Sequence, residues 1–510
     1  MNTEAETKAQ EAGELKYRLF PSVRMLFVML VGIGVGTMMI TRFNVSIAVV
    51  CMVDDDVTEG VMTSAGDGMG NGTRDIAITN GGELEVSTAG KGRGEFQWDK
   101  TFQGLLLSSY FYGYTAGLVP GGWIADKLPV VLVLLVSIGL QGLWTLVLPV
   151  VARTDPYLLL ALRALHGLCS SAALPAAQVF ARNWSVPVEY TTVFSLCWAF
   201  QYLLGGSAYP ISSSICQAWG WPAVFYITGA FPLLWMVVGW FLLTSSPDES
   251  SICPEDEKRY LASKRLFRVA TTKSLSDKNV TQESTPILAI ITNRQVLIVI
   301  GTFFTNSWFY YALNITLPTF LKETMGVNLT ENGFLSGLPT MSMTVGCVAG
   351  GKVFQYLLTR WQCSRTNARK IIATVAFLIP AALLGVILLL PPGMTYLTMS
   401  LLVLCNVTSV LGVAGGPLSA GPDIAPQFAG VIWGLSGSIG NLTGVLAPTI
   451  AAAMTPNKSL LEWRYFFLIA LVMNVVMDLA VILFWKSEVQ TFAKTEENET
   501  EAQNKNTCEV

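Results

Sequence analysis

The sequence predicts an all-α membrane protein with twelve transmembrane helices in two pseudo-symmetric six-helix bundles. Three observations lead to this prediction: the composition, a series of long apolar stretches and an internal repeat. Of the 510 residues, 52% are hydrophobic and 13% are charged, and the mean hydropathy is +0.50. A soluble domain carries about 25% charged residues. A deficit of charge along the whole chain indicates a membrane protein with many spans.

The apolar stretches are long enough, at about 19 residues or more, to cross a bilayer as helices. Twelve of them can be placed along the chain. They cover residues 25–53, 102–124, 129–151, 157–180, 190–214, 222–244, 295–318, 334–357, 370–391, 395–418, 427–452 and 463–486.

Positive charge gathers between the sixth and seventh stretches. The basic residues there are Lys258, Arg259, Lys264, Arg265, Arg268, Lys273 and Lys278. A second basic group falls on the same side of the membrane and contains Arg360, Arg365, Arg369 and Lys370. Because cytoplasmic loops carry an excess of Lys and Arg, we expect both groups and both termini to be cytoplasmic.

These positions divide the chain into five parts. We expect a cytoplasmic tail over 1–22, a first bundle over 23–245, a cytoplasmic linker over 246–294, a second bundle over 295–486 and a cytoplasmic tail over 487–510. The first part is polar and lacks the apolar core of a cleaved signal peptide. The first span is therefore expected to start insertion into the membrane.

A long loop over residues 54–100, rich in Gly and Asp, is expected on the outer or luminal side. It contains the sequon Asn71-Gly72-Thr73, which makes Asn71 a candidate for glycosylation. Asn328 and Asn457 also begin sequons on that side, but they lie close to the membrane. Whether these two are glycosylated stays open.

Composition and motifs exclude several classes of function. The net charge of −3 and the lack of a long basic run give no sign of a nucleic-acid partner. The nine cysteines show no metal-ligand spacing, and we interpret them as free, small hydrophobic residues. No nucleotide-binding or hydrolase motif appears, so we expect neither an enzyme nor a bound cofactor or metal. A channel or a receptor remains as an alternative, although no selectivity-filter pattern is present.

The internal repeat appears when the chain is shifted by 229 residues, which lays "TFQGLLLSSYFYGYTAGLVPGG" over "TENGFLSGLPTMSMTVGCVAGG". Four glycines then coincide, since Gly104, Gly117, Gly121 and Gly122 meet Gly333, Gly346, Gly350 and Gly351. A shift of 238 residues pairs Gly206 with Gly444 and Pro210 with Pro448. A shift of 242 residues pairs Trp221 with Trp463 and Phe225 with Phe467. Two parallel repeats of six helices are typical of transporters whose halves rock around a central site.

Several motifs carry a resemblance to a known family. "GGWIADKL" matches the G-x-x-x-D-K core of the major-facilitator loop motif, without its following Gly and basic pair. "TRFNVSIAVV", "WDKTFQGLLLSSYFYGY", "RALHG", "GWPAVFYITG", "ENGFLSGLP", "DIAPQFAGVIWG" and "EVQTFA" resemble the anion–cation symporter family. That family holds sialin, the vesicular glutamate transporters and the type I sodium–phosphate transporters. The resemblance runs from about residue 25 to 494.

The resemblance implies the major facilitator fold and transport of organic anions, such as sialate-like or acidic amino-acid-like carboxylates. Sodium-dependent transport of inorganic phosphate or urate is the alternative. The driving force would be a proton gradient, a sodium gradient or voltage, with H⁺ or Na⁺ as a co-transported ion. We expect a monomer that spans the plasma membrane or a lysosomal or vesicular membrane.

Charged residues inside the predicted spans are candidates for the substrate site, because an intramembrane charge is costly unless it faces protein or water. Arg42 lies deep in the first span, and a guanidinium offers a planar fork for a carboxylate or phosphate. Arg163 follows in the fourth span, where His166, Gly167 and Ser170 share its helical face. Either arginine could instead hold helices together.

His166, the only histidine, is a candidate for proton coupling, because histidine titrates near neutral pH. A neutral structural histidine is the alternative. The family's sialin-like members have acidic residues at the positions of His166 and Ser170, and vesicular glutamate transporters have an arginine at the position of Asn306. This chain has no carboxylate in its fourth span, so the usual carboxylate route for protons is missing.

Further candidates line the second and seventh spans. Asn306, Tyr310 and Asn314 are spaced to share one helical face and could orient a substrate by hydrogen bonds. Tyr110 and Tyr114 present a similar face. Contact between helices is the alternative role for both groups.

The remaining ionisable candidates lie nearer the ends of the spans. Asp126 and Lys127 end the second span, where the family motif implies a gating role. Asp478 in the twelfth span has no obvious partner and is expected to be structural.

Overall fold

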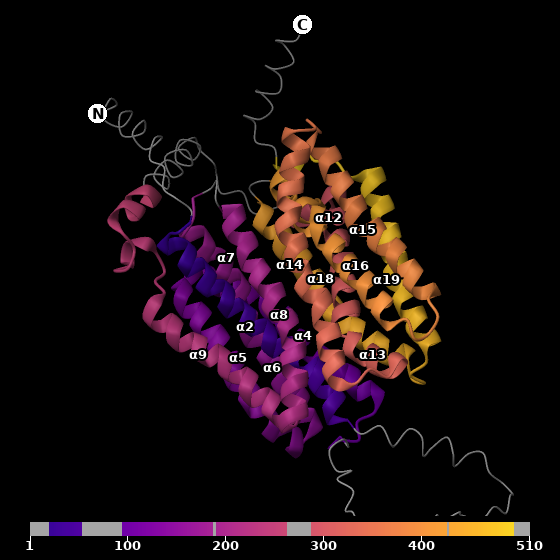
Figure 1. The fold of residues 1–510 in the computed structure, drawn as a ribbon. Helices are drawn as coiled ribbons and strands as arrows, with labels where there is room; N and C mark the ends of the chain where they lie inside the picture. The colour runs from indigo at the N-terminus through magenta and orange to yellow at the C-terminus, as the bar shows by residue number, and fades with distance from the viewer. Residues whose placement is uncertain (1–19, 54–93, 187–189, 263–286, 426–427, 494–510) are drawn as a thin grey trace, which may run out of the picture.

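The computed structural model describes residues 20–53, 94–186, 190–262, 287–425 and 428–493. Within these ranges the regular secondary structure is helical, apart from an isolated parallel bridge between Val53 and Phe96. Figure 1 shows two bundles of long helices side by side, the first in indigo to magenta and the second in orange to yellow. The fold class predicted from the sequence is confirmed.

The first bundle is built from six membrane-crossing segments. They are α2 (Val23–Met52), α4 (Lys100–Lys127), α5 (Val130–Thr154), α6 (Pro156–Ser170) with α7 (Ala173–Asn183), α8 (Tyr190–Trp219) and α9 (Trp221–Leu242). The short helix η1 (Pro247–Glu249) and a helix over residues 255–262 follow α9.

The second bundle repeats this plan. Its long segments are α12 (Arg294–Asn314) with α13 (Leu317–Met325), α14 (Leu329–Thr359), α15 (Arg365–Leu389), α16 (Thr395–Gly415), α18 (Ala429–Met454) and α19 (Leu460–Phe484). Short helices connect or flank them: α11 (Ile287–Thr292), η2 (Pro417–Ser419), α17 (Gly421–Ile424) and η4 (Thr491–Ala493).

The twelve predicted stretches each coincide with one of these segments, but two are broken. The fourth stretch turns between α6 and α7 at Ser171, and the seventh turns between α12 and α13 at Ile315. Polar caps explain where many helices begin. A side-chain oxygen accepts a hydrogen bond from a free backbone N–H in the first turn, as at Ser22, Asp99, Asp155, Asn293, Asn328, Ser364 and Ser459.

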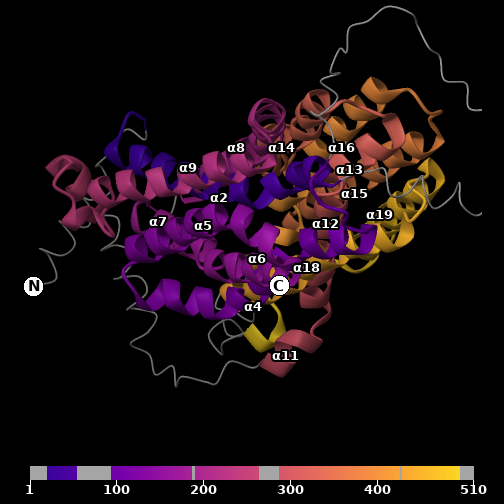
Figure 2. The ribbon, with the colours of Figure 1, turned by 90° about the horizontal axis from the view of Figure 1, so that it is seen from below.

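Eight segments are long and apolar enough to cross a membrane by composition alone. The four that fall short are α4, α8, α14 and α18. These four form the seam between the bundles, where α4 packs on α18 and α8 packs on α14. Figure 2 shows the same pairs along the seam. Because they face protein rather than lipid for much of their surface, they need less apolar character.

Small residues allow the close approach of helices at the seam, and they do so symmetrically. A Cβ on Gly104 of α4 would lie 2.6 Å from Ala452 of α18, while a Cβ on Gly333 of α14 would lie 1.9 Å from Ser213 of α8. The sequence repeat pairs Gly104 with Gly333. The register of the predicted repeat is therefore also the register of the contact between bundles.

The two ends of the molecule differ. We call the end where α2 begins and α19 ends the tail end, and the end where α2 ends and α4 begins the loop end. Most of the hydrogen bonds between described residues of the two bundles lie toward the loop end, as from Ser108 to Val445 O at 2.8 Å, while that from Thr344 to Ala199 O at 3.3 Å lies in the tail-end half of α8. Polar contacts between the bundles are thus concentrated toward the loop end, while α8 and α14 also contact each other in the tail-end half of α8.

The interpretation of all nine cysteines as free is wrong for two of them. Cys51 at the end of α2 and Cys216 near the end of α8 form a disulfide across 165 residues of sequence. The helices α2 and α8 pack against each other, and this contact brings the two thiols together. The other described cysteines are free: Cys169, Cys197, Cys253, Cys347, Cys363 and Cys405.

Candidate functional site

Arg42 lies in the second half of α2, with 7% of its surface exposed, inside a cage of aromatic rings. Its guanidinium carbon is 4.4 Å from the ring centre of Phe111, and 5.0 Å from those of Tyr110 and Tyr114. Across the seam it is 5.3 Å from the ring of Tyr311. Such cation–π contacts stabilise a buried guanidinium without neutralising its charge.

Tyr311 of α12 connects this arginine to the second bundle. Arg42 Nη2 donates a hydrogen bond of 2.8 Å to the Tyr311 hydroxyl, which donates in turn to Oδ1 of Asn441 on α18 at 2.7 Å. The chain of contacts runs from α2 through α12 to α18. Any rocking of the bundles must therefore change the surroundings of Arg42.

The face of α6 predicted from its spacing is buried against α4. Arg163 is 2% exposed, and His166 and Ser170 are fully buried. The Arg163 guanidinium carbon is 5.4 Å from the centre of the same Tyr110 ring that Arg42 covers. The Tyr110 hydroxyl is 2.6 Å from Ser170 Oγ. The structure thus brings the candidate residues Arg42, Arg163, Tyr110 and His166 together.

Two glycines explain how α6 comes so close to α4. A Cβ on Gly167 would lie 1.9 Å from the carbonyl oxygen of Tyr110, and a Cβ on Gly113 would lie 1.7 Å from that of Ala164. No side chain fits at either position. The glycine of "RALHG" therefore sets the distance between the tyrosines of α4 and the basic face of α6.

The charge of this site is unbalanced. The ion pairs between described residues use other basic side chains: Arg24, Lys100, Arg153, Lys258, Arg365 and Arg369. Within the described part of the chain, neither Arg42 nor Arg163 contacts a carboxylate, and Nε of both is buried without a partner. His166, whose Nδ1 lies 3.4 Å from Nη1 of Arg163, adds no negative charge, because an imidazole side chain is neutral or cationic. Two cations with free donors are suited to hold an anion.

The α12 candidates separate into different roles. Tyr310 is half-buried and its ring packs 5.2 Å from that of Tyr311 and 6.2 Å from that of Phe43. Asn314 is fully buried and binds protein only: it donates to Asn406 and accepts from Thr340 at 3.0 and 2.8 Å. Asn306 is half-buried one turn before Tyr310. The Asn314 contacts favour the alternative role, contact between helices.

Among the remaining predicted residues, Lys127 and Asp478 lie outside this cluster. Lys127 is exposed at the tail end of α4, and the side chain of Asp126 lies outside the described residues. Asn71 also lies outside the described residues. Asp478 is 3% exposed on α19, and its Oδ1 has no partner among the described residues.

The two other sequon asparagines form local hydrogen bonds at the starts of helices. Asn328 caps α14 and its side chain also binds Glu331. The side chain of Asn457 donates to Glu462 at 2.6 Å. Both amides are therefore occupied in the folded protein.

Sequence reasoning missed Tyr311 and Asn441. Helical spacing from Asn306 places Tyr310 on the same face of α12. The contact with Arg42 is instead made by the next residue, Tyr311. The available signal was the run of aromatic residues in "WFYY" and "YFYGY", which supplies more rings than a membrane helix needs for lipid contact. Which ring meets Arg42 depends on packing between bundles.

This geometry, a site of buried cations and aromatic rings between two pseudo-symmetric bundles, is the arrangement of a transporter. The sequence profile of the Major Facilitator Superfamily matches residues 31–448. Among solved structures, a bacterial homolog of the human lysosomal transporter Spinster, inward-facing and unoccupied, superposes with a TM-score of 0.61 at 13% identity, over 93% of this chain and 100% of that one. A D-xylose–proton symporter gives 0.57 at 14% identity, over 93% and 99%.

Proteins of similar sequence identify the family to which this chain belongs within the superfamily. Human sialin is 30% identical over 457 residues, which are 89% of this chain and 87% of sialin. Human vesicular glutamate transporter 2 is 30% identical over 415 residues, or 81% and 69% of the two chains. The uncharacterized transporter slc-17.2 of Caenorhabditis elegans is 28% identical over 491 residues, 95% of each. The chain belongs to the anion–cation symporter family of major facilitator transporters, which are not enzymes.

Proposed function

We propose that this transporter moves an organic anion, a carboxylate of the sialate or acidic amino-acid type, by alternating access around Arg42. The observation that carries the proposal is the pair of buried guanidiniums with free Nε groups and no carboxylate among the described contacts. The aromatic rings around Arg42 provide apolar surface for the organic part of the substrate. A relative, by its name, carries glutamate in vesicles, which agrees with this substrate class.

The arrangement of the bundles supports alternating access. Most of the described hydrogen bonds between the bundles lie toward the loop end, which favours a state in which the site communicates with the tail end. We place the tail end in the cytoplasm, because the basic residues Arg360, Arg365, Arg369 and Lys370 lie there. The loop end then faces a lumen or the exterior, with Asn71 as the available glycosylation site.

Voltage is the driving force that this site supports best. An anion that crosses without a compensating cation moves charge, and each elementary charge gains or loses about 2.3 kcal/mol per 100 mV. The carboxylate that would carry a proton beside Arg163 is absent, and Ser170 at the family's acidic position binds Tyr110 instead. Proton coupling through His166 and sodium coupling are the alternatives that the assay below separates.

The test is uptake into proteoliposomes of purified protein, with sialate, glutamate, aspartate, urate and phosphate offered separately. We expect carboxylate uptake in the wild type and a fall of at least about a hundredfold in Arg42→Ala, because two charge-assisted hydrogen bonds contribute about 1.5–3 kcal/mol each. Arg42→Lys keeps the charge but loses the planar guanidinium fork. Its uptake rate should therefore lie between that of the wild type and that of Arg42→Ala. Normal uptake by a folded Arg42→Ala protein would refute the site.

Proton, sodium and voltage gradients are imposed one at a time in the same assay. The proposal is supported if uptake follows voltage alone and if His166→Gln has the same pH dependence of uptake as the wild type. Uptake that follows a proton gradient and loses its pH dependence in His166→Gln would instead make His166 the coupling group. Uptake of phosphate in preference to every carboxylate would assign the chain to the alternative substrate class.

A further inference from the structure

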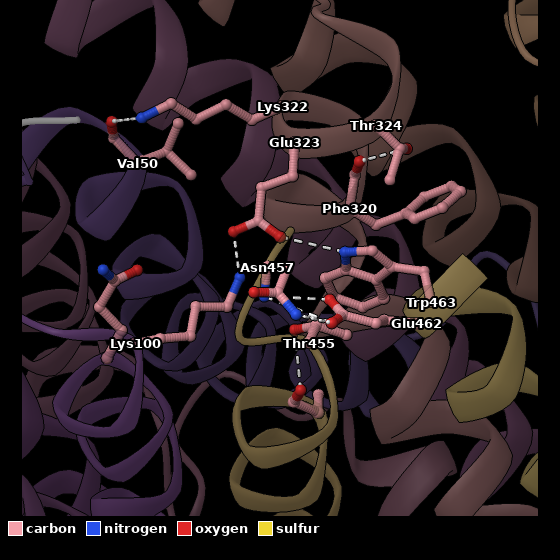
Figure 3. Close-up of polar contacts among 12 residues, drawn as sticks. Val50, Lys100, Phe320, Lys322, Glu323, Thr324, Thr455, Asn457, Glu462 and Trp463 are labelled. Carbon is pink, nitrogen blue, oxygen red and sulfur yellow. Dashed lines mark hydrogen bonds and ion pairs between the residues drawn. The ribbon is translucent and has the colours of Figure 1, made fainter. Parts of the chain in front are cut away.

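Two cations at the loop end of the molecule are balanced within the protein. The first, Lys100, begins α4 and forms an ion pair with Oε1 of Glu323 on α13, and its Nζ lies 5.5 Å from the centre of the Trp463 ring on α19. Trp463 Nε1 donates a hydrogen bond of 3.0 Å to Oε2 of Glu323 (Figure 3). We call these three residues the bridging triad, because they join the two bundles.

The second cation has the same kind of partners inside the first half of the chain. Glu95 accepts a hydrogen bond of 2.8 Å from Trp221 Nε1 and pairs with Arg153, whose guanidinium carbon is 5.0 Å from the centre of the Trp221 ring. We call these residues the single-bundle triad. In both triads a carboxylate of the protein balances the cation, and an indole ring covers it.

The tail end of the second bundle carries cations and aromatic rings without enough carboxylates to balance them. Its basic side chains lie on the turn between α14 and α15 and on the adjoining parts of α14, α15 and the end of α19. We call them the basic rim: Lys352, Arg360, Arg365, Lys370 and Lys486. All are exposed except Lys370, which is half-buried. The sequence has no Asp or Glu from residue 332 to residue 422.

The carboxylate that does reach the basic rim, Asp423 of α17, is already neutralised. Arg369 pairs with it at 2.9 Å, and these two side chains are only 7% and 10% exposed. Arg365 lies 3.5 Å from the same carboxylate with 69% of its side chain exposed. Glu488 is exposed beyond α19, and the described contacts include no ion pair from it. One buried carboxylate shared by two arginines leaves a positive surface.

Contacts between α15 and α19 make the basic rim continuous. Lys370 Nζ donates a hydrogen bond of 2.7 Å to the carbonyl of Ile482, and the backbone N–H of Ser487 donates to Thr366 Oγ1 at 3.0 Å. These bonds place Lys486 beside the start of α15. A backbone carbonyl does not neutralise an ammonium group, so Lys370 keeps its charge.

Two large aromatic side chains stand beside the basic rim. Trp361 in the turn and Tyr356 on α14 are 63% and 53% exposed, with ring centres 6.3 Å apart. The turn is held by a hydrogen bond of 3.1 Å from Cys363 N to Leu357 O, and Gln362 within it has a φ of 50°, which is uncommon for a residue other than glycine. Trp and Tyr at the ends of membrane helices lie at the level of lipid headgroups.

The orientation of the chain does not by itself explain this charge. Cytoplasmic ends are expected to be basic in both bundles, but the tail end of the first bundle is balanced by acid. Its segment after α9 contains Asp248, Glu249, Glu255, Asp256 and Glu257 against Lys258 and Arg259. The turn between α4 and α5, which corresponds to the turn between α14 and α15, has Lys127 next to Asp126 in sequence. Unbalanced positive charge is therefore a property of the second bundle.

We propose that the basic rim, with Trp361 and Tyr356, is a binding site for anionic glycerophospholipids in the leaflet at the tail end. Guanidinium and ammonium groups donate charge-assisted hydrogen bonds to the lipid phosphate, while the two rings pack against the glycerol and the upper acyl chains. Each basic residue near an anionic membrane surface contributes about a fivefold preference. The lipid supplies the negative charge that the protein supplies itself in the two triads.

The occupant is a lipid rather than a soluble anion because of where the rings lie. A phosphate or carboxylate from solution would need the cations alone, whereas Trp361 and Tyr356 expose apolar surface at the end of a membrane-crossing helix. The proposal concerns a different surface from the substrate site and does not depend on it.

The experiment locates bound lipid on the full chain. The protein is reconstituted in nanodiscs of phosphatidylcholine with a small share of phosphatidylserine that carries a photoreactive diazirine in its acyl chain. After irradiation, mass spectrometry of peptides maps the crosslinks. We expect them to concentrate on residues 352–370, and unlabelled phosphatidylserine to reduce them at least about tenfold more than added phosphatidylcholine does.

Two results of this mapping would overturn the proposal. Crosslinks spread evenly over the lipid-facing helices would show non-specific contact with the bilayer only. Inorganic phosphate that displaces the crosslinks as well as phosphatidylserine does would assign the basic rim to a soluble anion.

Neutral substitutions test the cations. The triple variant Lys352→Gln, Arg360→Gln and Arg365→Gln should lose crosslinking to residues 352–370 by at least about tenfold. Lys127→Gln at the corresponding turn of the first bundle is the matched control and should crosslink like the wild type. A triple variant that is folded by circular dichroism and keeps wild-type crosslinking, or an equal loss in Lys127→Gln, would contradict the assignment.

Trp361→Ala tests the same site if the triple variant does not fold. We expect crosslinking to fall by about threefold, because the ring that holds the lipid at headgroup level is lost. Trp219→Ala, which removes an indole that is 70% exposed at the loop end of α8, should have no effect; equal effects of the two would overturn the proposal. Arg42→Ala should crosslink like the wild type, so failure of the transport proposal and failure of the lipid proposal are distinguishable.

Discussion

The single-bundle triad and the bridging triad use the same chemistry at corresponding places in the two halves. The sequence repeat pairs Trp221 with Trp463. In each triad the indole N–H donates to a carboxylate, at 2.8 Å for Glu95 and 3.0 Å for Glu323. In each, a cation lies over the indole ring, at 5.0 Å for Arg153 and 5.5 Å for Lys100.

The triads differ in where the cation comes from and in how much solvent reaches them. Arg153 belongs to the same bundle as its partners, and the Arg153 and Glu95 side chains are 50% and 41% exposed. Lys100 comes from the opposite bundle, and the pair is mostly buried. The same local interaction therefore stabilises one bundle in the first half and joins two bundles in the second. Only the second can report on the opening of the transporter.

Charge reversal at Lys100 should produce the largest difference between the triads. Lys100→Glu places two carboxylates together in a mostly buried contact, so we expect the loop-closed state to lose about 3 kcal/mol. Arg153→Glu affects an exposed pair that contributes about 0–1 kcal/mol, and should leave the equilibrium between bundles unchanged. Pulsed electron paramagnetic resonance on spin labels at Tyr157 and Leu461, which are 74% and 57% exposed at the loop ends of α6 and α19, measures the loop-open fraction in both cases.

The double variant Lys100→Glu with Glu323→Lys is the control for charge reversal. It restores opposite charges across the seam and should recover the closed state at neutral pH. If the double variant stays as open as Lys100→Glu, the ion pair is not what holds the loop end closed, and the comparison between the triads fails.

Replacement of the indoles by phenylalanine tests the hydrogen bonds alone. Trp463→Phe leaves Oε2 of Glu323 without its donor in a site that water reaches poorly, which should cost about 1–2 kcal/mol of folding free energy. Trp221→Phe should cost less, since solvent can replace the donor to the more exposed Glu95. Unfolding in detergent, followed by circular dichroism, compares the two; equal losses would show that burial does not distinguish the triads.

The smallest effect is expected from acid on the single-bundle triad. The hydrogen bond from Arg153 lowers the pKa of Glu95 below its usual range. A lowered pKa in the folded state means that the contribution to stability is present at neutral pH and is lost only as the pH falls through that lowered value. The stability difference between wild type and Glu95→Gln should thus be the same at about pH 7.5 and about pH 5, within about 0.5 kcal/mol. A difference that disappears at about pH 5 would contradict this assignment.

The sequence by itself indicated the order of the long helices, because most spans are long apolar runs, although the four at the seam fall short by composition alone. The repeat determined the pairing of the two halves, and two of its glycine pairs, Gly104 with Gly333 and Gly206 with Gly444, lie at the seam. Arg42 and Arg163 could also be selected from the sequence, because a charge deep in a span is costly enough to require a reason.

Only the tertiary structure decided which partners those residues have. The contact of Arg42 with Tyr311, the disulfide of Cys51 with Cys216 and the pairing of Lys100 with Glu323 join residues 269, 165 and 223 positions apart. Helical spacing relates residues within one or two turns, and it carries no information about which face of a distant helix packs opposite. That choice follows from the packing of whole bundles, which is why the substrate candidates were found from the sequence and the bridging triad was not.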